Sequence, residues 1–127
     1  IKRWREKLSN RLDLHSFGYD RIINVPYLSG CFMFLRTEAL KKVGLFDENI
    51  FMYSEDVDLN RRIFRNYKTH FYPYVTVVHE HQKESFKNKR LLKAHIQAMI
   101  YYFNKYGWFF DKERTRINTE VMKQIKA

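Results

Sequence analysis

The chain has little cysteine, glycine or proline, and each shortage excludes a class of protein. The single cysteine, Cys31, rules out an internal disulfide and a four-cysteine zinc cluster. Four glycines and two prolines among 127 residues are too few for a linker or a disordered tail. No apolar run approaches the roughly 18–20 residues that cross a bilayer. The length is enough for one modest domain with one core.

Acidic residues are also scarce, and their distribution is uneven. The chain has 24 Lys and Arg against 14 Asp and Glu, a net charge of +10. Five of those 14 acids lie in residues 47–58, which contain no Lys or Arg. Like charges repel, so such a cluster costs stability unless a cation, a helix end or a reacting group offsets it. The aromatic run that ends at Tyr53 leads into Glu55 and Asp56, which favours carboxylates at the floor of a cleft.

The first two thirds of the chain are predicted to mix strands and short helices. Residues 31–35 form a continuous apolar run, which predicts a buried strand. Thr37 is expected to cap a short helix that ends at Gly44. Ser54 is expected to cap a helix that continues to about residue 66, and residues 70–79 alternate as a strand does.

The last third is predicted to be helical. A long helix is expected from residue 91 to 106, with Gly107 as its stop. Asp111 is expected to cap a final helix, whose buried face carries apolar residues at a spacing of four: Ile117, Val121 and Ile125. Residues 1–12 are basic and predict a helix or an ordered connection.

Glu55 and Asp56 fall in the first turn of a predicted helix, where free backbone N–H groups and the helix dipole favour negative charge. Such a carboxylate can act as a general base if an acceptor hydroxyl lies within hydrogen-bond reach. Acids at helix starts are also common simply because they stabilise helices, and for an isolated pair this explanation is the simpler one. Asp58 is expected to pair with Arg61 or Arg62.

Two further features have both a functional and a structural explanation. His79 ends a predicted strand, where an imidazole binds a metal or phosphate, or only makes a local hydrogen bond. The basic segment 83–95 and the aromatic residues of 101–110 fit a nucleic-acid or membrane surface, or a core helix with a solvated face. Zinc binding by His79, His81 and Cys31 does not fit the spacing of a finger.

Four separated blocks occur in an order that resembles one enzyme family. They are Tyr27-Leu28-Ser29-Gly30-Cys31-Phe32-Met33, Val43-Gly44-Leu45-Phe46-Asp47-Glu48, Phe51-Met52-Tyr53-Ser54-Glu55-Asp56-Val57-Asp58-Leu59 with Arg62, and Val77-Val78-His79-Glu80-His81. This pattern is similar to the carboxy-terminal half of a family-2 glycosyltransferase of the bacterial rhamnosyltransferase kind. The resemblance covers about residues 25–85, and four blocks in register are far more specific than any one of them.

The resemblance implies an α/β chain with a partial GT-A (Rossmann-like) fold. Residues 1–85 would form its acceptor-side half and residues 86–127 a helical tail. It implies inverting transfer of a sugar from a nucleotide-diphosphate sugar to a hydroxyl, a hexosyltransferase-type step in surface polysaccharide or glycan synthesis. Asp56 is the first choice for the base and Glu55 the second. The residues assigned to substrate binding are Gly30, Ser29, Tyr53 and Arg62, and His79 is assigned to a divalent metal, Mg²⁺ or Mn²⁺.

The resemblance also implies what this chain lacks. No Gly-rich phosphate loop or Asp-x-Asp motif precedes residue 25, so we expect the nucleotide-binding half to lie upstream and this piece alone to bind neither donor nor metal and to be inactive. The expected partners are the donor sugar, a saccharide or lipid-linked acceptor, an anionic membrane surface and a second copy of the chain, without nucleic acid. The expected location is cytoplasmic, at the inner face of the cell membrane. The alternative is a basic, aromatic-rich nucleic-acid-binding or membrane-docking module without catalysis.

Overall fold

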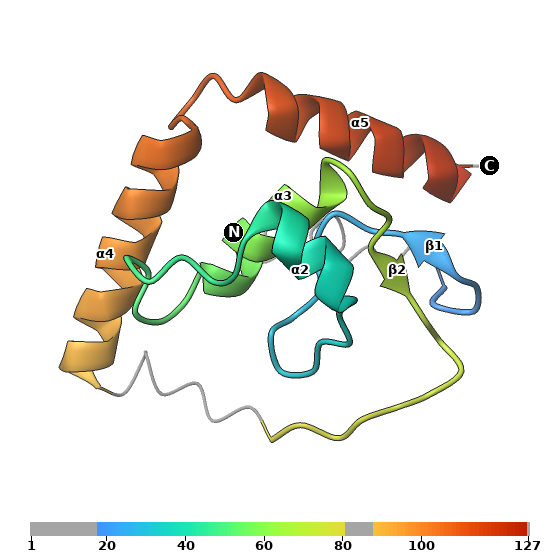
Figure 1. Cartoon of the computed structure of the whole chain (residues 1–127), viewed down its shortest axis with the longest axis horizontal. Coiled ribbons are helices and arrows are strands. Elements are labelled where there is room, and N and C mark those ends of the chain that lie inside the picture. Colours follow the sequence, from blue (N-terminus) through green and yellow to red (C-terminus); the bar gives the residue numbers. More distant parts are fainter. Residues whose placement is uncertain (1–17, 81–87, 127) are drawn as a thin grey trace, which may run out of the picture.

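The computed structural model describes residues 18–80 and 88–126, which form four helices and a two-stranded sheet. The helices are α2 (Thr37–Val43), α3 (Glu55–Phe64), α4 (Lys89–Tyr106) and α5 (Lys112–Lys126), and the strands are β1 (Ile23–Asn24) and β2 (His70–Phe71). Figure 1 shows α2 and α3 in the middle of the molecule, with α4 and α5 on the outside. The chain is therefore mixed α/β, with helix as the main component.

The sheet is antiparallel and very short. Ile23 pairs with Phe71 and Asn24 with His70. Two further hydrogen bonds extend it by one residue, because the Val25 N–H donates to the Thr69 carbonyl over 2.8 Å and the Thr69 N–H donates to the Asn24 side chain over 2.6 Å.

Both predicted strands differ from the structure. The segment after β2 turns at Pro73 and Tyr74 and forms no further strand up to residue 80, so only the first two residues of the predicted strand 70–79 are confirmed. The predicted strand at 31–35 is wrong: these residues form no strand, and Phe34 is 94% exposed. The apolar run indicates burial, but no described strand lies beside it to supply hydrogen bonds.

The helix ends follow local signals more closely. Gly44 ends α2 with φ of 87°, and Gly107 ends α4 with φ of 107°, both in the positive region that glycine tolerates. The Asp111 carboxylate accepts from the Arg114 N–H over 2.9 Å and so caps α5 as predicted. The start of α4 differs: the helix begins two residues earlier than predicted, at Lys89, because the Asn88 side chain accepts from two backbone N–H groups of the first turn.

Two predicted caps are not made by side chains. Thr37 is the first residue of α2 rather than its cap, and Arg36 precedes the helix without a capping side chain. Ser54 does precede α3, but its φ of 66° is left-handed and its hydroxyl does not cap the helix. The helix α3 ends at Phe64, two residues before the predicted end.

The core lies between α3, α5 and the sheet. Leu59 and Ile63 of α3 are buried, as their spacing of four predicts. Phe64 packs with Ile117 and Val121 of α5, and Ile125 contacts both this cluster and the one around β1. The predicted apolar face of α5 is therefore confirmed. None of the helices that the structure describes is long and apolar enough to cross a membrane.

Candidate active site

The Asp56 carboxylate is fixed by the loop of residues 27–30 and by the start of α3. Its Oδ2 atom accepts a hydrogen bond from the Tyr27 hydroxyl over 2.9 Å and another from the Gly30 N–H over 2.8 Å. Its Oδ1 atom accepts from the N–H of Val57 over 2.8 Å. A carboxylate oxygen can accept about two hydrogen bonds, so Oδ2 is fully used and Oδ1 retains room for a further donor.

Gly30 is needed for this contact. A Cβ atom added there would lie 3.1 Å from the Cβ and 3.2 Å from the Oδ2 of Asp56, closer than ordinary packing permits. The resemblance predicts that Gly30 makes room for substrate, and the neighbour that the structure shows is Asp56 itself. Ser29, the other predicted substrate contact of this loop, is exposed, and its hydroxyl accepts from the Cys31 N–H over 3.4 Å.

Glu55 lies beside Asp56 as the first residue of α3. Its Oε2 atom is buried and has no hydrogen-bond partner among the described residues. A buried carboxylate oxygen without a donor costs stability. The Oε2 atom of Glu55 therefore has unused hydrogen-bond acceptor capacity among the described residues.

Tyr53 and Ser54 lead into these acids with strained backbone. Their φ values of 68° and 66° lie in the left-handed region, which is uncommon for residues other than glycine. The Tyr53 ring stacks on the imidazole of His95 from α4, with ring centroids 4.5 Å apart. This stack attaches the entry to the acidic pair to α4, and the sequence pattern did not point to His95.

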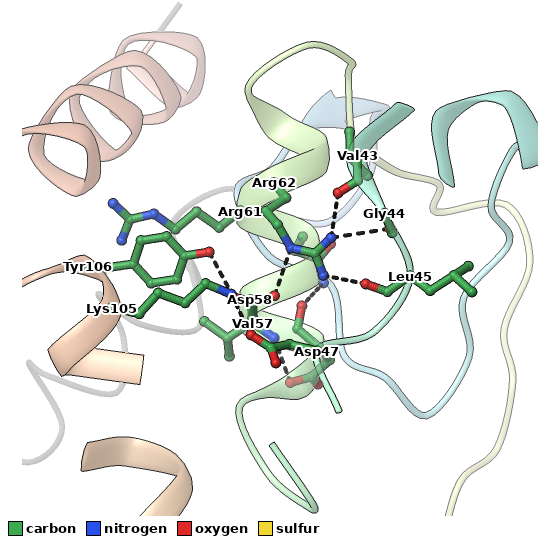
Figure 2. A network of polar contacts seen from close by, with 12 residues as sticks. Val43, Gly44, Leu45, Asp47, Val57, Asp58, Arg61, Arg62, Lys105 and Tyr106 are labelled. Atoms are coloured by element: carbon green, nitrogen blue, oxygen red, sulfur yellow. Dashed lines mark hydrogen bonds and ion pairs between the residues drawn. The ribbon is translucent and has the colours of Figure 1, made fainter. Parts of the chain in front are cut away.

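Asp47 and Asp58, which also lie in residues 47–58, have different hydrogen-bond partners from Glu55 and Asp56. The Lys105 ammonium of α4 donates to Asp47 over 2.6 Å and to Asp58 over 2.7 Å, and the Tyr106 hydroxyl also donates to Asp58 (Figure 2). Although burial opposes ionisation, these donors keep the pKa of the fully buried Asp58 below its usual value. The Lys105 hydrogen bond has the same effect on the pKa of Asp47.

Arg62 is predicted to bind substrate, but in the structure its guanidinium group donates hydrogen bonds to groups of the protein itself. Its Nε donates to Asp58 over 2.8 Å, which confirms one of the two predicted partners of Asp58. Its Nη1 and Nη2 donate to the carbonyls of Val43 and Leu45, both over 2.7 Å (Figure 2). Arg62 thereby ties the end of α2 to α3.

Arg61 turns to the other side of α3. It binds both carboxylate oxygens of Asp111, over 2.6 and 2.7 Å, and donates to Glu113 over 2.8 Å. The Tyr106 ring lies 4.0 Å from the guanidinium carbon of Arg61, a cation–π contact. The neighbouring Arg65 makes two further bonds to Glu113. This ion-pair cluster fastens α5 to α3. Neither Glu55 nor Asp56 is one of its members.

The described residues do not supply a metal site. His79 is exposed in the extended segment after β2 and contacts neither Glu55 nor Asp56 in any recorded hydrogen bond or ring contact. No group of three or more His, Cys, Asp or Glu side chains in residues 18–80 and 88–126 is placed to hold a metal ion. A hollow of about 520 Å³ does exist, but it lies between the sheet and α5, away from Asp56.

Comparison with known proteins gives the site its context. Residues 11–98 match the family described as glycosyltransferase-like family 2. The chain is 32% identical over 89 residues to the N-acetylglucosaminyl-diphospho-decaprenol L-rhamnosyltransferase of Mycobacterium tuberculosis, covering 67% of this chain and 29% of that protein. It is 28% identical over 98 residues to the rhamnosyltransferase WbbL of Escherichia coli, covering 75% of this chain and 37% of that protein. No solved structure matches.

The matched region contains the loop of residues 27–30 and the whole of α3, so it includes both candidate carboxylates. The chain spans about a third of the length of these curated relatives. A family match over more than half of the chain, in agreement with the four sequence blocks, shows that this chain belongs to the family-2 glycosyltransferases.

Proposed function

We propose that this chain forms the acceptor-side part of an inverting glycosyltransferase with the GT-A fold, in which Asp56 is the general base. The observation that carries the proposal is the Asp56 carboxylate, which is oriented by Tyr27 and Gly30 and keeps one lone pair of Oδ1 available. Family membership supplies the reaction class, and this geometry supplies a proton acceptor in a fixed position.

The proposed step is a single displacement. The acceptor hydroxyl gives its proton to Asp56, and its oxygen forms a bond to the anomeric carbon of the donor sugar. The bond from that carbon to the diphosphate breaks, and the nucleoside diphosphate leaves with the electron pair. Because attack and departure occur on opposite faces, the anomeric configuration inverts. The Val57 N–H in the first turn of α3 holds Oδ1 of the base in place.

Glu55 is the second choice for the base. Its buried, unpartnered Oε2 can accept a hydroxyl proton, or it can accept a hydrogen bond that orients the acceptor sugar. Paired substitutions in the full-length protein separate these roles. Asp56→Asn is expected to lower kcat by roughly 10²–10⁴-fold, as loss of a general base does.

Glu55→Gln is expected to affect the acceptor KM more than kcat. Release of nucleoside diphosphate and transfer to acceptor are both measured, with circular dichroism as the check on folding. Near-normal kcat in Asp56→Asn together with a large loss in Glu55→Gln moves the base to Glu55. Normal rates in both variants refute the proposed site.

The relatives narrow the proposed substrates. One is named a rhamnosyltransferase, and the other is named for transfer of L-rhamnose to N-acetylglucosaminyl-diphospho-decaprenol. We therefore propose nucleotide-diphosphate-activated rhamnose as the first donor to test and a lipid-linked saccharide as the first acceptor, in surface polysaccharide synthesis. The donor half, with a divalent metal, is proposed to come from a nucleotide-binding region outside this chain. His79 fits at most one ligand position, so no step here depends on the metal.

An anionic membrane surface is the second proposed partner, at the cytoplasmic face. The helix α4 has four Lys or Arg and no acid, and it exposes apolar side chains at helical spacing: Leu92, Ile96, Met99 and Ile100. At its end, Phe109 is 83% and Phe110 is 96% exposed. A basic helix with an exposed apolar stripe is the usual form of an interfacial helix. Binding of nucleic acid, the alternative from the sequence, is not favoured by the family match.

A further inference from the structure

The loop of residues 27–30 and the first turns of α3 are joined by side chains that the proposed reaction does not itself use. Besides the bonds from Tyr27 and Gly30 to Asp56, the Asn60 side chain donates from Nδ2 to the Leu28 carbonyl over 2.9 Å. The same Nδ2 donates to the Asp56 carbonyl over 2.8 Å. One amide group therefore connects the loop to the backbone of the candidate base.

Asn60 occupies an unusual position for an amide. Only 1% of the residue is exposed, and its Oδ1 atom is buried with no hydrogen-bond partner among the described residues. An unpaired buried oxygen costs stability, so an apolar side chain of similar size would pack there at no such cost. What Asn60 does supply is a fixed distance between the Leu28 carbonyl and the Asp56 backbone.

Tyr27 contacts the carboxylate itself. Partial burial, and then the negative charge of Asp56, raise the pKa of the Tyr27 phenol well above its ordinary value. The phenol therefore stays protonated at neutral pH and remains a hydrogen-bond donor to Oδ2. The other titratable group beside the Tyr27–Asp56 pair is Glu55 of α3, and no cationic side chain of residues 18–80 and 88–126 bonds to the Asp56 carboxylate.

From these contacts we infer that Tyr27 and Asn60 are positioning residues of the glycosyltransferase reaction. Tyr27 orients the Asp56 carboxylate, and Asn60 fixes the loop that carries Tyr27 and Gly30 against α3. The inference rests on the proposed role of Asp56. Neither residue contacts the transferred proton, and each acts through Asp56.

The first test replaces Tyr27 with Phe in the full-length protein and measures kcat and the KM for the acceptor. Loss of the phenol hydroxyl removes one of the two hydrogen bonds that hold Oδ2 of Asp56, so the orientation of the carboxylate is less well fixed. We expect kcat to fall at least about tenfold while the KM changes less than about twofold, because only the orientation of the base is disturbed. Tyr72→Phe is the matched control: its ring packs on Tyr74 and its hydroxyl has no recorded bond to the acids.

The second test replaces Asn60 with Leu and separates kcat from KM. We expect kcat to fall at least about tenfold while the KM for a nucleotide-diphosphate rhamnose changes less than about twofold, because only the orientation of the base is disturbed. Asn66→Ala, in an exposed residue after α3, is the control. If Asn60→Leu fails to fold, Tyr27→Phe alone decides the inference.

The outcomes distinguish this inference from the function on which it rests. Asp56→Asn with full activity refutes the proposed function. An inactive Asp56→Asn, together with a kcat of Tyr27→Phe that equals that of Tyr72→Phe, refutes the inference and leaves the function standing. A lower kcat of Tyr27→Phe with an unchanged KM and an unchanged unfolding midpoint supports it, because a merely structural contact would not separate kcat from KM.

Discussion

At the scale of single residues, the acids of residues 47–58 have two different surroundings. Lys105 forms ion pairs with Asp47 and Asp58, and Arg62 also pairs with Asp58. Within the described part of the chain, Asp56 accepts from uncharged donors and Glu55 keeps an oxygen without a partner. The sequence shows that these acids are gathered but not how they divide. Lys105 lies 47 positions from Asp58 along the chain, and only the fold brings them together. The pairing of Asp58 with Arg62, at helical spacing, was predictable because it is local.

The ion pairs of α5 predict a dependence of stability on pH. The hydrogen bond from Arg65, assisted by Arg61, lowers the pKa of Glu113 to about 2 from an ordinary 4.5. A carboxylate with a lowered pKa in the folded state contributes its stability above the unfolded pKa and loses it as pH falls. The free energy of unfolding is therefore expected to decrease between about pH 4.5 and pH 2, measured by urea denaturation of this chain.

The variant Glu113→Gln isolates this contribution. It should be less stable than the original chain at pH 7, and its stability should fall less steeply below pH 4.5. Glu120→Gln is the matched control, because among the residues that the structure describes Glu120 pairs with the exposed Arg116 over 3.7 Å, and such exposed pairs contribute little. Equal slopes for Glu113→Gln and Glu120→Gln would show that the Glu113 cluster does not govern acid stability.

At the scale of elements, three helix ends were predictable from local signals, whereas the caps expected from Thr37 and Ser54 and most of the expected strand residues were not found. Gly44, Gly107 and Asp111 act through backbone conformation or a hydrogen bond within one turn, so the residue type carries the information. A strand depends on a partner that is remote in sequence. The run at residues 31–35 has the composition of a strand, yet the structure gives it no partner among the described residues. The short strand β1 lacks any strong signal and is defined by its pairing with β2.

The start of α4 has a local signal, the Asn88 side-chain cap, that is not among the predictions from the sequence. Asn88 accepts from the Arg90 N–H over 2.9 Å and from the Leu91 N–H over 3.4 Å. Asn88→Ala should lower the free energy of unfolding by about 1 kcal/mol, the usual effect of losing an N-cap. Asn88→Ser should retain most of it, since a hydroxyl also caps. Urea denaturation measures both, and equal stability of the two variants would contradict the capping role.

At the scale of the whole molecule, the described residues bury a small core and expose many large apolar side chains. The two buried clusters contain five residues: Ile23, Val25, Phe64, Ile117 and Val121. Phe34, Val78 and Phe110 are each at least 90% exposed and lie in separate segments. Patterning could identify these residues as apolar but not as exposed, because exposure depends on what else packs nearby. Exposed apolar surfaces of this kind favour association with a partner. That this partner is a second copy of the chain stays a prediction.

Among these surfaces, the end of α4 has the charge that a membrane partner requires. Trp108, Phe109 and Phe110 form an apolar turn between two helices with a surplus of basic residues (Figure 1). Apolar side chains enter the interface, while Lys and Arg attract anionic head groups by about 1 kcal/mol each. We expect the chain to float with vesicles that contain anionic lipid and to be recovered far less with neutral ones.

The double variant Phe109→Ser/Phe110→Ser should weaken binding to anionic vesicles by at least about tenfold, since burial of one Phe contributes roughly 1.5–3 kcal/mol. Its control is Phe32→Ser/Phe34→Ser, which removes two Phe that are 64% and 94% exposed on a different loop. Each double variant removes two exposed Phe side chains. If binding to anionic vesicles is weaker in Phe109→Ser/Phe110→Ser than in the control, the contact with lipid lies at the α4–α5 turn. Equal recovery of both variants, or equal recovery of the original chain with anionic and neutral vesicles, would refute the membrane surface.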